Sequence, residues 1–113
     1  MVAPVENAVI QWEEGYARVQ ATRARDAALY RAIGRVVTGV ERVLRKRLGS
    51  RFSVGELAEL YRDQADSLLD EALLTIPGEP PLADASAACD AAFYLYMREA
   101  FDFGGGKMRP ASR

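Results

Sequence analysis

The segment ATRARDAAL, residues 21–29, decides the fold, because it either joins two apolar helical patterns into one helix or separates them. Before it, apolar residues recur at steps of four and three, the period of one helical face: Val5, Val9, Trp12, Tyr16 and Val19. After it, the same phase returns at Tyr30, Ile33, Val37, Val40 and Leu44. Within it, Arg23 and Asp26 interrupt the apolar seam without changing its phase. A turn has no reason to conserve phase, so we predict one continuous helix over residues 5–48.

The alternative is two helices that meet near residues 21–26. A continuous helix of this length would extend roughly 66 Å at 1.5 Å per residue, and most globular helices are nearer a dozen residues. Gly34 and Gly39 would each cost about 1 kcal/mol relative to alanine in its interior. The two possibilities predict different bundles.

Two further helices have clearer ends. Ser53 and Glu56 have the spacing of a capping box, which predicts a helix over residues 54–76 that ends at a Pro-Gly pair. The last helix is predicted over residues 82–103, between a proline at its start and three glycines at its end.

The predicted fold class is therefore all-α, an antiparallel three-helix bundle with a long N-terminal helix. If the first helix breaks, the alternative is a four-helix bundle. We expect residues 1–103 to form a single helical domain and residues 104–113 a flexible basic tail.

Composition restricts the function classes. The chain contains no histidine, which excludes Ser-His and Cys-His nucleophile pairs and histidine-containing metal sites. We expect no enzyme activity, no cofactor, no metal and no small-molecule substrate. The single cysteine, Cys89, fits a reducing compartment, and no apolar run is long enough to span a membrane. These features favour a cytoplasmic protein, bacterial in style, with no membrane partner.

Charge is divided unevenly along a chain whose net charge is −1. Six basic residues are candidates for binding phosphates or an acidic partner: Arg31, Arg35, Arg42, Arg45, Lys46 and Arg47. Five acidic residues form a stripe on the second predicted helix: Glu56, Glu59, Asp63, Asp66 and Asp70. Each stripe lies opposite the apolar face of its own helix, so we do not expect the two to meet inside one chain. The same pattern is typical of the solvated face of an amphipathic helix.

The last helix carries a wide aromatic arc. Tyr94, Met97 and Phe101 share one side and are candidates for an exposed aromatic patch that binds a partner. The other interpretation is a central position in the bundle, where both sides of the arc are covered.

The seam of Trp12 and Tyr16 carries the main functional hypothesis. If residues 5–48 are one helix, the two shorter helices cover only half of it, and the exposed seam from Val5 to Val19 marks an interface. We then expect a non-enzymatic interaction or adaptor module that forms a homodimer or binds a larger protein. The alternative is a nucleic-acid-associated regulator that contacts phosphates through the arginine-rich stretch 31–51.

Overall fold

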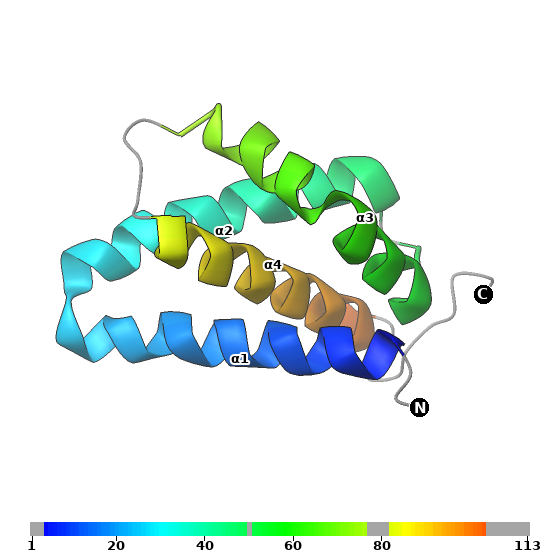
Figure 1. Ribbon diagram of the computed structural model, residues 1–113, viewed down its shortest axis with the longest axis horizontal. Coiled ribbons are helices and arrows are strands. Elements are labelled where there is room, and N and C mark those ends of the chain that lie inside the picture. The colour runs from blue at the N-terminus through cyan, green and yellow to red at the C-terminus, as the bar shows by residue number, and fades with distance from the viewer. Residues whose placement is uncertain (1–3, 50, 77–81, 104–113) are drawn as a thin grey trace.

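Four helices make up the part of the chain that the computed structural model describes, residues 4–49, 51–76 and 82–103. They are α1 (Pro4–Arg25), α2 (Ala27–Leu48), α3 (Val54–Leu73) and α4 (Leu82–Phe103), and Figure 1 shows their arrangement. The described residues are all-α. The continuous helix over residues 5–48 is wrong, and four helices fit the alternative bundle better than the three-helix one. The tail predicted at residues 104–113 lies outside the described residues.

The first predicted helix breaks at a single residue. Asp26 has an extended backbone (φ −154°, ψ 93°), and its side chain accepts a hydrogen bond from the Leu29 amide at 3.1 Å. It is therefore the N-cap of α2, a role in which aspartate stabilises a helix by about 1 kcal/mol. The Asp26 amide still donates to the Thr22 carbonyl, and the Tyr30 amide donates to the Asp26 carbonyl. Because only one residue leaves the helical conformation, the apolar phase continues across the break.

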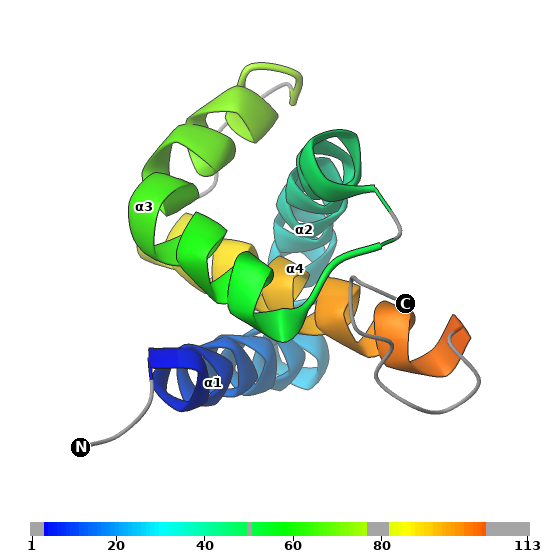
Figure 2. The ribbon, with the colours of Figure 1, turned by 90° about the vertical axis from the view of Figure 1, so that its right-hand side faces the viewer.

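Helix α4 is the central element of the bundle. It packs against each of the other three helices, and Figure 2 shows it running between them. Its buried surface is built mainly from small residues, which allow the other helices to approach closely: Ala85, Ala87, Ala88, Ala91 and Ala92. Phe93 adds a large side chain to this surface and stacks on the Trp12 ring, with the ring centroids 5.5 Å apart.

Helices α1 and α4 approach each other closely at Gly15. A Cβ atom placed on Gly15 would overlap the Cβ of Asp90 and lie 3.1 Å from the carbonyl oxygen of Ala87. A glycine is required here because no larger residue fits between the two helices without moving them.

The structure confirms the predicted start of α3 but not its predicted end. Ser53 and Glu56 form the predicted capping box, since each side chain accepts a hydrogen bond from the backbone amide of the other. The C-terminus is Leu73 and not residue 76, because the chain enters a turn in which the Thr75 hydroxyl donates to the Ala72 carbonyl at 2.9 Å. None of the described helices is both long enough and apolar enough to cross a membrane.

Candidate functional site: an arginine-lined groove on α2

The predicted N-terminal interface is core in the single chain. Trp12 is fully buried and Val19 almost so, while Val9 and Tyr16 are partly buried against the core. The side chain of Val5 lies outside the described part. The seam would be exposed if two shorter helices had to cover one continuous helix over residues 5–48. In the structure α1 folds back beside α4, and that expectation is wrong.

The aromatic patch is also mostly covered. Met97 is buried, and Tyr94 is partly buried beneath the ring of Tyr16, with centroids 4.8 Å apart. The side chain of Phe101 is not among those described. The central position of α4 explains the wide aromatic arc, because its two sides face different neighbours.

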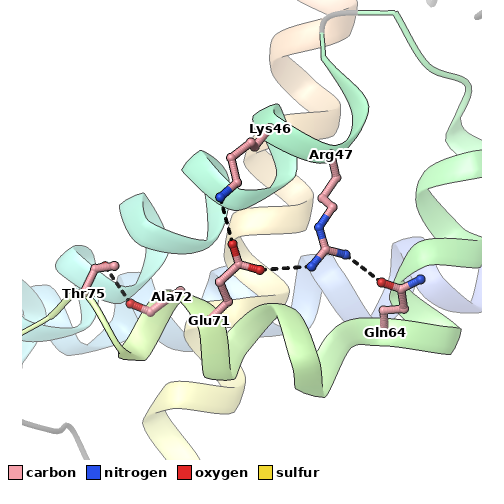
Figure 3. A network of polar contacts seen from close by, with 6 residues as sticks. All are labelled: Lys46, Arg47, Gln64, Glu71, Ala72 and Thr75. Atoms are coloured by element: carbon pink, nitrogen blue, oxygen red, sulfur yellow. Dashed lines mark hydrogen bonds and ion pairs between the residues drawn. The ribbon is translucent and has the colours of Figure 1, made fainter.

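The six basic candidates divide into two groups of three. The later group, at the C-terminal end of α2, is engaged within the chain. Lys46 Nζ and Arg47 Nη2 each lie 3.0 Å from a carboxylate oxygen of Glu71 on α3, and Arg47 Nη1 donates to Gln64 Oε1 at 2.6 Å. Figure 3 shows these side chains converging from the two helices. They join α2 to α3.

Arg45 makes the equivalent link to α4. Its guanidinium lies 2.6 Å from Glu99 Oε1 and 5.6 Å from the centre of the Tyr96 ring. Burial, with a further contribution from Glu99, raises the pKa of the nearby Glu41, whereas Arg45 opposes that rise. Arg45 thus offsets the negative charge of both Glu99 and Glu41, and it links α2 to α4.

The earlier group is different. Arg31, Arg35 and Arg42 are exposed, and their side chains form no hydrogen bond or ion pair with any described residue. Together they line an open groove of about 610 Å³ between α2 and the turn after α3, where Thr75 and Ile76 form the other wall. Three guanidinium groups in one groove provide forked donors that match carboxylates or phosphates.

Gly34 and Thr38 complete the groove on the α2 side. A Cβ atom placed on Gly34 would meet nothing within 4 Å, so the space above this glycine is open. Glycine lowers the stability of a helix interior by roughly 0.8–1 kcal/mol relative to alanine. No packing contact requires glycine at this position, in contrast to Gly15.

The acidic stripe lies on the outer face of α3 and is exposed along its length. Asp63 pairs with its neighbour Arg62 at 2.9 Å, and Glu56 belongs to the capping box. Glu59, Asp66 and Asp70 form no ion pair with any described residue. The two charged stripes do not contact each other within the described chain. The described ion pairs between α2 and α3 are formed instead by Glu71, which lies outside the predicted acidic stripe.

A second hollow of about 600 Å³ lies between α1 and α3, and Tyr61 is part of its lining. The Tyr61 hydroxyl donates to Asp90 Oδ1 at 2.8 Å and stands 3.5 Å from Gln11 Oε1. Burial raises the pKa of Tyr61, and the hydrogen bond to Asp90 adds to that rise. Burial also raises the pKa of Asp90, although the Tyr61 hydroxyl and Arg18 oppose it.

The sequence does not reveal this polar cluster, because its members come from three different helices. Trp12 lies beside it, edge-to-face with the Tyr61 ring, and its buried indole nitrogen has no hydrogen-bond partner among the described residues. The cluster places one half-buried carboxylate and one hydroxyl at the meeting of α1, α3 and α4, where each satisfies the other.

Among the described residues, no three acidic or cysteine side chains are grouped so that they could hold a metal ion. The arginine-lined groove is therefore the described feature whose chemistry most clearly favours an external ligand. Comparison with protein-family models, with curated proteins and with solved structures gave no match to this chain.

Proposed function

We propose that this protein is a non-enzymatic interaction module whose α2 groove binds an acidic surface of a protein partner. The observation that carries the proposal is the difference between the two groups of bases. Arg45, Lys46 and Arg47 all have acidic partners within the chain, whereas Arg31, Arg35 and Arg42 line a groove without any among the described residues. Guanidinium groups that have no ion pair with a described residue can pair with carboxylates of an incoming protein. Such pairs orient the partner and raise the rate of association.

A protein partner suits the groove better than a nucleic acid. The chain has a net charge of −1 and an isoelectric point near 5.5, whereas nucleic-acid-binding domains are usually strongly basic. One wall contains Ile76, and the adjoining Leu74 has 86% of its surface exposed. A protein surface can cover such an apolar neighbour, whereas a phosphodiester backbone cannot.

The test uses a synthetic helical peptide that carries glutamates at relative positions 0, 4, 7 and 11. Its binding to dilute protein is followed by fluorescence anisotropy at low salt. We expect R35Q/R42Q to weaken binding about tenfold, because the glutamine side chains cannot form charge-assisted hydrogen bonds with the peptide carboxylates. The matched control R23Q/R25Q removes the same charge from exposed positions of α1 and should bind like the wild type.

A second variant separates groove binding from general electrostatic attraction. Gly34→Gln keeps every charge but places a side chain in the open space above residue 34. We expect it to weaken peptide binding while the protein remains at least as stable as the wild type, because the helix loses a glycine. Equal peptide affinity for wild type, R35Q/R42Q and Gly34→Gln would refute the proposal.

The nucleic-acid alternative rests on the same three arginines, since guanidinium groups along one helical face can contact successive phosphates. A salt titration of binding to random duplex DNA tests it. A steep fall in affinity with salt, abolished by R35Q/R42Q, would favour phosphate binding over the protein partner. Absence of duplex binding at low salt removes this alternative.

A further inference from the structure

We propose that the partner in the groove is a second copy of this chain, which presents the acidic face of its own α3. This inference rests on the proposed function of the groove and names its occupant. It begins from the observation that one chain carries two complementary stripes, both exposed and, within the described residues, not in contact with each other.

The spacing of the two stripes matches. On α2, Arg31, Arg35, Thr38 and Arg42 stand at relative positions 0, 4, 7 and 11. On α3, Glu59, Asp63, Asp66 and Asp70 stand at the same relative positions. Residues at this spacing form a nearly straight line along a helix, about 16 Å long at 1.5 Å per residue. Two such helices can therefore lie side by side with their charges in register.

Some charged residues of the two stripes form no ion pair with a described residue of their own chain. In an antiparallel register, these residues fall opposite one another. This register places Asp70 opposite Arg31, Asp66 opposite Arg35 and Glu59 opposite Arg42. The remaining acid, Asp63, then faces the neutral Thr38. Asp63 already pairs with Arg62, so it has no need of a further cation.

The neutral positions between the charges also agree with this register. Gly34 on α2 falls opposite Ser67 on α3, so two small residues meet between the pairs Arg31–Asp70 and Arg35–Asp66. One turn beyond the charges, Leu74 falls opposite Ala27. Leu74 keeps a helical backbone, and its exposed side chain gains an apolar contact there.

A parallel register is less favourable. It would place Arg62 opposite Gly34, between the cations Arg31 and Arg35, and would bring Leu74 opposite Lys46. Like charges would then be adjacent and the exposed leucine would face an ammonium group. The antiparallel arrangement avoids both.

The resulting contact is heterologous, because α2 of one copy meets α3 of the next and each copy can use both of its stripes. A two-fold axis along the helices would instead pair residues that are level within one chain, where Gly39 lies against Ala72 and Arg47 against Gln64. Exposed ion pairs contribute little individually, so we expect weak self-association with a dissociation constant of roughly 0.1–1 mM at low salt. Raising the ionic strength should weaken it about tenfold, because the paired charges are exposed to solvent.

Charge reversal in two separate variants tests the register. R35E/R42E makes α2 acidic, and E59R/D66R makes α3 basic. Each variant alone brings like charges together at the α2–α3 contact between copies and should be monomeric in sedimentation experiments at the highest concentrations used. Mixed in equal amounts, they should associate with each other, because the reversed α2 stripe of one variant then meets the reversed α3 stripe of the other, and their original stripes also remain complementary. The matched control E13R/E14R reverses two exposed acids of α1 and should associate like the wild type.

A further variant tests the apolar end of the contact. Leu74→Ser removes an exposed side chain and should leave the free energy of unfolding nearly unchanged, while it weakens association severalfold. Restored association in the mixture, together with the effect of Leu74→Ser, supports the inference.

The outcomes separate this inference from the proposed function. If the wild type stays monomeric at millimolar concentration, or the mixed variants fail to associate, a second copy is not the occupant. In that case, binding of the acidic peptide to dilute wild type would still uphold the groove as a site. If the peptide fails to bind and the mixed variants also fail, both proposals are wrong.

Discussion

Gly15 on α1 and Asp90 on α4 lie so close together that a single added methyl group at residue 15 would overlap the Cβ of Asp90. The overlap involves atoms attached directly to the two backbones, so no side-chain rotation relieves it. This contact sets the distance between the N-terminal helix and the centre of the bundle.

The first prediction compares two glycines. Gly15→Ala should lower the free energy of unfolding by about 2 kcal/mol, because the cost of forcing α1 away from α4 exceeds the gain in helix propensity. Gly34→Ala, with open space around the new methyl group, should raise it by about 0.5–1 kcal/mol. Urea unfolding of both variants measures the difference. A Gly15→Ala protein as stable as the wild type would contradict the close α1–α4 contact.

The second prediction concerns the buried tryptophan. Trp12→Ala should destabilise the protein by about 3–5 kcal/mol, since it leaves a cavity between Tyr61 and Phe93. In the wild type at low concentration, Trp12 fluorescence should be blue-shifted and resist quenching by acrylamide, because none of its surface is exposed. An indole that acrylamide quenches freely in the dilute native protein would show that the seam is not core and that α1 does not fold back on α4.

The third prediction is a pH dependence from Asp90. Burial raises the pKa of Asp90 in the folded state, so the folded protein binds a proton that the unfolded chain releases. Its contribution to stability therefore falls as the pH rises from the ordinary carboxyl value of 3.8 through the raised folded pKa. Asp90→Asn should flatten this part of the stability profile. Tyr61→Phe should steepen it, because the hydroxyl that favours the carboxylate is removed. Unchanged profiles in both variants would contradict the assignment.

The fourth prediction concerns thiol reactivity. Burial, together with the negative charge of Asp90, raises the pKa of Cys89 to about 12. Because the thiolate is the reactive species, the native protein should react with a thiol reagent at pH 8 orders of magnitude more slowly than the urea-unfolded chain. Native-state labelling as fast as that of the unfolded chain would place Cys89 at the surface.

Local signals predicted much of the secondary structure. The capping box at Ser53 and Glu56 correctly placed the start of α3, and the proline and glycine punctuation correctly placed both ends of α4. These signals work because they depend on hydrogen bonds and backbone preferences within a few residues.

The break at Asp26 shows why periodicity alone was insufficient. A single extended residue changed the direction of the chain without shifting the apolar phase, so the seam looks the same in one helix or in two. The chain folds back because α1 then buries Trp12 against α4, and apolar burial of this size outweighs the disruption of the helix at one residue.

Sequence by itself determined that this chain is helical, where most helices begin, and that its basic and acidic residues form separate stripes. Only the tertiary structure decided which of those charges are already paired. Arg45, Lys46 and Arg47 meet carboxylates because the C-terminal end of α2 lies beside α3 and α4, whereas Arg31, Arg35 and Arg42 face an open groove. Helical period fixes which residues share a face, but the packing of distant helices determines what that face meets.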